Sequence, residues 1–188
     1  MSNVEKEAAG TAQQRQLEFR SAMARLGAAV NIVTTEGPAG RRGLTASAVC
    51  SVTDSPPTVL ICVNRQSACN AVFKANGLLC VNILASRHRA LCQRFAGQAE
   101  SAGARFGTDH RWVKLATGAP VLEDATAAID CRITQIAEIG THSVFFAEVV
   151  AIHLGEQPEG LIYFDRDFHR VSQIAAIRQS AGGEPASD

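Results

Sequence analysis

The feature that most constrains the fold is a succession of short, β-branched segments separated by turn residues and not by regular helical stretches. Strands joined by short turns pair in antiparallel fashion, whereas parallel strands need a crossover, usually a helix. This pattern favours a mainly β fold, an antiparallel barrel, over a doubly wound sheet. We expect strands over residues 28–35, 44–53, 58–64, 78–84, 127–139, 142–153 and 160–164.

A few helices are expected beside these strands. Apolar residues recur near helical spacing over 13–26, and shorter helices are predicted over 67–76 and 86–95. Ser67 is the predicted N-cap of the second helix, and Gly77 ends it. Residues 109–122 are predicted to be loop. No linker divides the chain, so we expect one domain over residues 13–175, with flexible ends over 1–12 and 176–188.

Charge and hydropathy exclude several classes of partner. Eighteen basic side chains balance eighteen acidic ones, so no overall field attracts nucleic acid or an anionic membrane. The apolar stretches are far shorter than the roughly 20 residues that span a bilayer. The N-terminal residues lack the apolar core of a secretory signal. We therefore expect a cytoplasmic protein with no nucleic-acid or membrane partner.

Six cysteines and five histidines show no spacing typical of a metal site, so no metal is predicted. We interpret the cysteines as reduced thiols that mostly fill the core. The signatures of a Rossmann nucleotide site, a P-loop, a zincin and an α/β-hydrolase are also absent. Any nucleotide that binds here would therefore use a different scaffold.

The segment GLTASAVCSVTDSPP over 43–57 alternates small apolar residues with mostly hydroxylated ones. Such side chains leave the backbone accessible, and backbone amides and carbonyls match the polar edge of a flat heteroaromatic ring. A strand packed closely on another element has the same pattern. Ser67 could serve a phosphate or only cap its helix, and His142 and His169 could be structural turn residues.

Five motifs in order are similar to those of one known family. They are GLTASAVCSVTDSPP over 43–57, LCVNIL over 79–84, FAG over 95–97, GTH over 140–142 and GLIYFDRDFH over 160–169. Over roughly residues 17–172 the chain resembles the flavin reductase family of two-component flavin-dependent monooxygenases. It is most similar to the reductases of 4-hydroxyphenylacetate 3-monooxygenases and, nearly as much, to the FMN reductases of pyrimidine utilisation.

The resemblance implies a Greek-key split β-barrel that forms a homodimer with a flavin near the subunit interface. Many relatives have Gly-Asp-His where this chain has Gly-Thr-His, so the positioning of the nicotinamide by His142 departs from their pattern. For the flavin ring, the implied binding residues are Thr45, Ala46, Ser47 and Ala48, with Cys50, Ser51 and Val52 lining the pocket. Near the ribityl phosphate they are Asn64, Ser67 and Ala68, and the residues that close the site are Phe95, Ala96 and Gly97. His142 is implied beside the nicotinamide, and Tyr163 and His169 are implied as further contacts.

The implied reaction is hydride transfer from NADH, or alternatively NADPH, to FMN or FAD, which then serves a partner monooxygenase. Holding two rings in contact is enough for this chemistry, so no catalytic nucleophile is predicted and His142 is the one candidate contributor. The alternatives are a non-catalytic flavin-binding barrel, an oxidase acting directly on a small substrate, and a subunit that activates a monooxygenase by contact.

Overall fold

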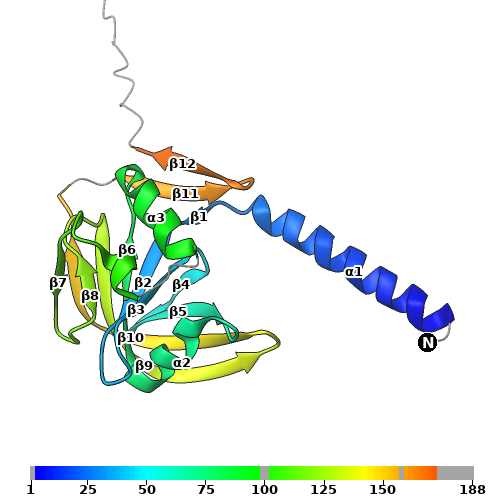
Figure 1. Ribbon diagram of the computed structural model, residues 1–188, viewed down its shortest axis with the longest axis horizontal. Coiled ribbons are helices and arrows are strands. Elements are labelled where there is room, and N and C mark those ends of the chain that lie inside the picture. The colour runs from blue at the N-terminus through cyan, green and yellow to red at the C-terminus, as the bar shows by residue number, and fades with distance from the viewer. Residues whose placement is uncertain (1–2, 98–101, 157–158, 173–188) are drawn as a thin grey trace, which may run out of the picture.

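The computed structural model describes residues 3–97, 102–156 and 159–172 (Figure 1). Its helices are α1 (Asn3–Ala24), α2 (Ala68–Asn76), the short 3-10 turn η1 (Ser86–His88), α3 (Arg89–Ala96) and α4 (Ala102–Phe106). Its strands are β1 (Ala28–Ala29), β2 (Asn31–Thr35), β3 (Arg42–Ala46), β4 (Val49–Asp54), β5 (Pro57–Asn64), β6 (Leu78–Ile83), β7 (Trp112–Lys114), β8 (Pro120–Leu122), β9 (Ala127–Ile139), β10 (His142–Leu154), β11 (Gly160–Phe164) and β12 (Asp167–Val171).

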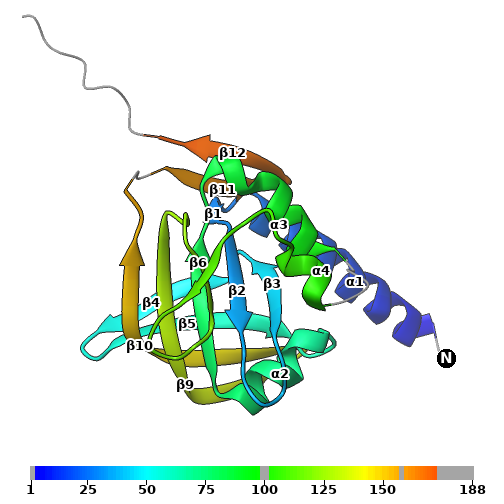
Figure 2. The ribbon, with the colours of Figure 1, turned by 60° about the vertical axis from the view of Figure 1, so that its left-hand side comes forward.

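Seven of these strands form one antiparallel sheet in the order β3-β2-β6-β9-β10-β5-β4. The two edge strands, β3 and β4, are separated by Ser47 and Ala48 alone. Because two residues cannot cross a flat sheet of seven strands, the sheet must curl until its edges approach. The result is a split barrel that is open between its edge strands β3 and β4, and Figure 2 shows the curled sheet. The expected fold class is confirmed.

Two smaller sheets and the helices complete the molecule. Strands β1, β11 and β12 form a three-stranded sheet, and β7 pairs with β8. Helices α2 and α3 both pack on β3, while α1 extends away from the barrel (Figure 1). The short helices thus gather on the edge strand that borders the gap.

The core has a large cluster inside the barrel and a second one beneath α3. Phe73 and Phe145 meet edge to face inside the barrel, with ring centroids 6.1 Å apart. In the second cluster the Phe95 ring lies 5.1 Å from that of Phe106. Four cysteines are buried, Cys62 is half-buried and Cys50 is exposed, and all are free thiols. Their expected role as core residues holds for Cys69, Cys80, Cys92 and Cys131.

Several predicted elements occur where the sequence placed them. The long hairpin of β9 and β10 turns at Gly140, whose φ of 54° is in the left-handed region that favours glycine. Helix α2 has Ser67 as its N-cap, with Oγ accepting from the Cys69 amide at 3.3 Å. It ends at Gly77, with a φ of 67°. Local capping and turn chemistry therefore determine these boundaries.

The single strand predicted over 44–53 was wrong, because β3 and β4 are two strands on opposite edges of the sheet. Small apolar and hydroxylated residue types keep alternating in the sequence of this run, while the chain exchanges one hydrogen-bonding partner, β2, for another, β5. Such an exchange leaves no trace in the hydrophobic pattern. The predicted loop over 109–122 was also wrong, since it contains the β7–β8 hairpin.

The ends of the chain also differ from expectation. The first helix begins at Asn3, ten residues earlier than predicted, in a segment rich in the strong helix formers Ala, Glu, Lys and Gln. The flexibility expected for residues 1–12 stays a prediction, and the expected tail over 176–188 lies outside the described residues.

No helix in the described part is long and apolar enough to cross a membrane. Among the same residues, no cluster of three His, Cys, Asp or Glu is placed to hold a metal ion.

Candidate functional site

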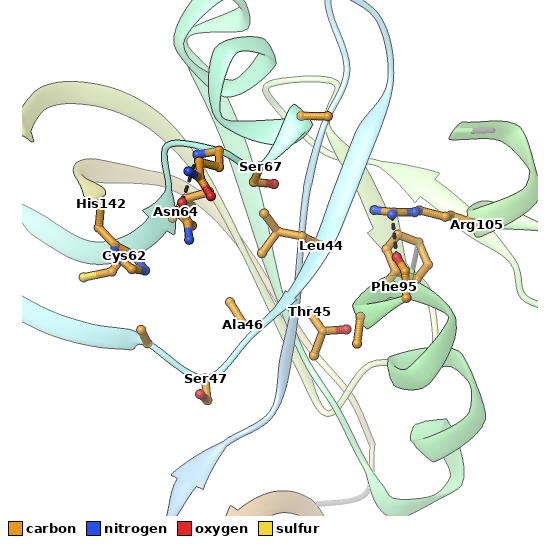
Figure 3. Close-up of a pocket in the computed structure, with 16 residues that line it drawn as sticks. Leu44, Thr45, Ala46, Ser47, Cys62, Asn64, Ser67, Phe95, Arg105 and His142 are labelled. Atoms are coloured by element: carbon orange, nitrogen blue, oxygen red, sulfur yellow. Dashed lines mark hydrogen bonds between the residues drawn. The ribbon is translucent and has the colours of Figure 1, made fainter. Parts of the chain in front are cut away.

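A cavity of about 670 Å³ lies beside the gap of the barrel, over β3 and between α2 and α3 (Figure 3). In the close-up, Leu44, Thr45 and Ala46 run along its centre. Asn64, Ser67 and His142 lie on one side of them, with Phe95 and Arg105 on the other. The lining residues are Leu44, Thr45, Ala46, Ser47, Ala48, Cys62, Val63, Asn64, Gln66, Ser67, Ala68, Phe95, Ala96, Gly97, Arg105 and His142.

The central strand β3 offers the cavity small side chains and a nearby backbone. The Thr45 hydroxyl donates to the Cys92 carbonyl of α3 at 2.6 Å, so that hydroxyl already has a partner within the protein. After Ala46 the chain leaves the β2 ladder, and the amide of Val49 donates back to the Ser47 carbonyl at 3.0 Å. The corner at Ser47 and Ala48 therefore brings main chain and small side chains to the cavity.

The α2 side of the cavity is built by strand register and by a helix start. The pairing of β5 with β10 places His142 directly opposite Asn64. Asn64 Oδ1 accepts from the Gln66 amide at 2.9 Å, and Ser67 caps α2. The amides of the first helical turn are natural partners for an anionic group. Thr141 Oγ1 lies 2.9 Å from His142 Nδ1.

The α3 side depends on a close approach between Gly43 and Phe95. A Cβ on Gly43 would lie 2.6 Å from Phe95 Cε1, so only glycine lets this ring pack against β3. Arg105 ties the two elements together, since its guanidinium donates to the Gly43 carbonyl at 2.8 Å and to the Gly97 carbonyl at 2.7 Å. Phe95 is almost completely buried, and its ring packs edge to face against that of Phe106.

The cavity matches the chemistry of a flavin nucleotide. Its described lining contains one arginine and one histidine and no carboxylate, which favours an anionic or electron-rich ligand. Its volume is that of a typical site for a ligand of this size. Backbone of β3 and the Ser47 corner would face the polar edge of the ring, and Asn64, Ser67 and the start of α2 would face the phosphate. These residues therefore fit the group.

A second cavity of about 700 Å³ adjoins the first across Thr45, Ser47, Ala96 and Gly97, which line both. Its far wall comes from the β11–β12 hairpin and α3. Aromatic rings and guanidinium groups face it, a combination that suits a nucleotide. The residues confined to this second cavity are Val30, Arg89, Cys92, Gln93, Tyr163, Arg166, Asp167 and Phe168.

The structure brings most of the predicted residues together. Tyr163 lines the second cavity only, and the His169 ring lies on the surface with Nε2 3.2 Å from the Phe164 carbonyl. Cys50, Ser51 and Val52 lie outside both cavities of the single chain, exposed on β4, because the two-residue corner carries them to the other sheet edge. The predicted residues that line the main cavity are Thr45, Ala46, Ser47, Ala48, Asn64, Ser67, Ala68, Phe95, Ala96, Gly97 and His142.

Five residues of the main cavity had not been predicted: Leu44, Cys62, Val63, Gln66 and Arg105. Leu44, Val63 and Gln66 each adjoin a predicted residue. The two-residue period of the strands would also have indicated Leu44 and Cys62. Arg105 comes from a five-residue helix that no pattern in the sequence announces. Its place in the site follows only from the three-dimensional structure.

Comparison with known proteins agrees with this geometry. Residues 23–172 match the model of the flavin reductase like domain. The FMN reductase (NADH) RutF of Variovorax paradoxus is 55% identical over 155 residues, which cover 82% of this chain and 85% of that protein. The 4-hydroxyphenylacetate 3-monooxygenase reductase component of Pseudomonas aeruginosa is 52% identical over 159 residues, 85% and 94% of the two chains.

A solved structure adds a likeness in three dimensions. The Streptomyces globisporus NADH:FAD oxidoreductase SgcE6, in complex with NAD and FAD fragments, superposes with a TM-score of 0.77 at 27% identity. The match covers 88% of this chain and 96% of that one. On the family match over residues 23–172, this chain belongs to the flavin reductase-like domain family.

Proposed function

We propose that this protein is an NADH-dependent flavin reductase that supplies reduced FMN or FAD to a separate flavin-dependent monooxygenase. The observation that carries the proposal is the cavity over β3, with its accessible backbone, its helix start and its lack of carboxylates in the described lining. Relatives named as NADH-dependent FMN reductases, at more than half identity, support the same activity.

When bound, the flavin supplies the redox chemistry, since it takes two electrons and a proton from the reduced nicotinamide. The residues of this chain bind and orient the two rings. Phe95 and the Ala96–Gly97 segment close one side of the cavity, and His142 stands at the opposite side. Arg105 is the one arginine in the described lining of this cavity, and its positive charge would stabilise negative charge that develops on a bound flavin ring. Positioning of this kind needs no nucleophile.

The partner is proposed to be the oxygenase component of a two-component system for aromatic degradation, such as a 4-hydroxyphenylacetate 3-monooxygenase. One relative is named as the reductase component of that enzyme. The second candidate is an oxygenase of pyrimidine degradation, because other relatives are named RutF. A cytoplasmic location would place the reductase beside its supply of NADH.

The active form is proposed to be a homodimer. Large apolar side chains are exposed on β4 and on the paired strands β9 and β10, and a monomer rarely leaves many such side chains uncovered. A second copy would also bring a surface to β4, where Cys50, Ser51 and Val52 are exposed. The exposed apolar residues of these strands are Val52, Ile136, Ile139, Val150, Ile152 and Leu154.

A coupled assay across a dialysis membrane tests the proposal. The reductase, NADH and FMN are placed on one side, and the oxygenase component of a 4-hydroxyphenylacetate 3-monooxygenase with its substrate on the other. Product in the second chamber is expected, because reduced flavin diffuses freely. Tight flavin binding without NADH oxidation would instead support the non-catalytic alternative, and product formed only on direct mixing would support activation by contact.

A further inference from the structure

A third cavity, of about 620 Å³, lies between helix α1 and two loops of the barrel. One loop follows β5 and the other is the turn between β9 and β10. Asn64, Gln66 and His142 line both this cavity and the main one, so the two are neighbours. The complete lining of the third cavity is Gln16, Arg20, Asn64, Arg65, Gln66, Thr141 and His142.

The chemistry of this lining is that of a phosphate site. It contains two guanidinium groups, an imidazole, three amides and a hydroxyl, and no carboxylate among the described residues. Guanidinium groups bind phosphate oxygens through paired, charge-assisted hydrogen bonds. Amide and hydroxyl donors add further hydrogen bonds to the same oxygens. The lining therefore favours an anion with several oxygens.

Both arginines are available for such an anion. Arg20 makes no ion pair within the described part of the chain. Arg65 has one, with Glu138 at 3.8 Å, and both side chains are about half exposed, so that pair is weak. Glu138 is held more closely by Lys74 at 2.6 Å, and it would keep this partner if Arg65 turned toward a ligand.

The end of α1 that carries Arg20 is fixed to the body of the protein. The Asp165 amide, in the β11–β12 turn, donates to the Ala24 carbonyl at 2.6 Å. In the same turn, the Arg166 guanidinium donates to the Ser21 hydroxyl at 3.3 Å. Gln16 and Arg20 are four residues apart and so project from the same face of the helix. The position of Arg20 over the third cavity follows from these contacts.

We propose that this third cavity binds the phosphate groups of a nucleotide whose ring lies in the main cavity, with Arg20 and Arg65 as the phosphate ligands. The proposal rests on the proposed function, because it takes its nucleotide from the flavin or the nicotinamide substrate. It makes helix α1 a part of the substrate site, although α1 extends away from the barrel over most of its length (Figure 1).

Substrates with and without phosphate test the proposal. NADH is compared with 1-benzyl-1,4-dihydronicotinamide, and FMN with riboflavin, for the wild type, Arg20→Ala and Arg65→Ala. Arg20→Ala and Arg65→Ala should each raise KM about tenfold, which corresponds to about 1.4 kcal/mol, for one of the two phosphate-bearing substrates, NADH or FMN. KM for the phosphate-free substrate of the same pair should be unaffected. An effect on NADH assigns the site to the nicotinamide nucleotide, and an effect on FMN assigns it to the flavin nucleotide.

Arg15→Ala is the matched control, since Arg15 lies on the same helix outside the cavity and its loss removes the same charge. An unchanged KM for both NADH and FMN in the Arg20 and Arg65 variants would overturn the proposal. Equal losses with the phosphate-free substrates would also overturn it. Dissociation constants for NADH and for the flavins give the same comparison without turnover, so failure of the proposed reductase activity would be distinguished from failure of this site.

Discussion

At the scale of single residues, the site depends on one absent side chain. Gly43 has a φ that any residue can adopt, so it is not required for backbone conformation. It is required because the Phe95 ring occupies the space where a Cβ would lie, 2.6 Å away. The same glycine carbonyl accepts from Arg105 at 2.8 Å. One residue thus positions an aromatic wall and a cation of the cavity.

Gly43→Ala should therefore displace Phe95 and weaken flavin binding. Overpacking of this kind costs about 1–3 kcal/mol of stability, and the displaced ring would intrude on the cavity. Quenching of flavin fluorescence gives the dissociation constant, and urea unfolding gives the free energy of unfolding. Gly10→Ala is the control, because a Cβ there meets nothing within 4 Å. Unchanged flavin affinity in Gly43→Ala would show that Phe95 does not form a wall of the binding site.

His142 gives a second prediction at this scale. Its imidazole lines the main cavity at the side opposite Phe95 and faces the third cavity as well. His142→Ala should raise the apparent KM for NADH severalfold and leave flavin affinity nearly unchanged, which steady-state kinetics and a flavin titration measure. An unchanged KM would remove His142 from the nicotinamide site.

At the scale of elements, buried groups hold the connections that shape the cavity. His88 ends η1 just before α3, and its ring is fully buried. Its Nδ1 accepts from the Ala85 amide at 3.1 Å, and its Nε2 lies 3.0 Å from Asp124 Oδ2. Both contacts are satisfied by a neutral ring with its proton on Nε2. Burial lowers the pKa of His88 below its ordinary value of 6.5, against the opposing effect of Asp124.

This pKa makes the fold sensitive to acid. Below about pH 6.5 the unfolded chain binds a proton at His88 that the folded chain resists. The stabilisation is therefore complete above that pH and decreases as the pH falls toward the lower pKa of the folded state. Urea unfolding of the wild type should give a lower free energy of unfolding at mildly acidic than at mildly alkaline pH. His88→Gln should reduce this difference and His169→Gln, an exposed control, should not; equal slopes in all three would contradict the assignment.

The elements also show what the sequence can and cannot predict. The β9–β10 hairpin and α2 were predicted almost to the residue, because a glycine turn and an N-cap are local signals. The split of 44–53 into β3 and β4 was missed, because the exchange of partners at Ser47 depends on strands distant in sequence. Arg105 was missed for the same reason. The resemblance, and not the periodicity, supplied most of the site residues.

At the scale of the whole molecule, the exposed apolar strands predict association. A homodimer should be visible by light scattering after size-exclusion chromatography. Ile152→Asp, which places a charge on the exposed face of β10, should shift the protein toward the monomer with its far-ultraviolet circular dichroism unchanged. Arg132→Asp introduces an aspartate on the neighbouring strand β9 and serves as the comparison. It changes the charge of the protein without removing an apolar side chain. A wild-type protein that stays monomeric at micromolar concentration would contradict the prediction.

The central claim is that the cavity over β3 holds a flavin that this protein reduces with NADH. The most direct measurement is the loss of NADH absorbance at catalytic protein concentration, with FMN, FAD or riboflavin added separately and NADPH in a parallel series. The account predicts many turnovers for each protein molecule, at a rate that rises with added flavin and saturates, and faster with NADH than with NADPH. Absence of NADH oxidation in the presence of bound flavin would contradict it.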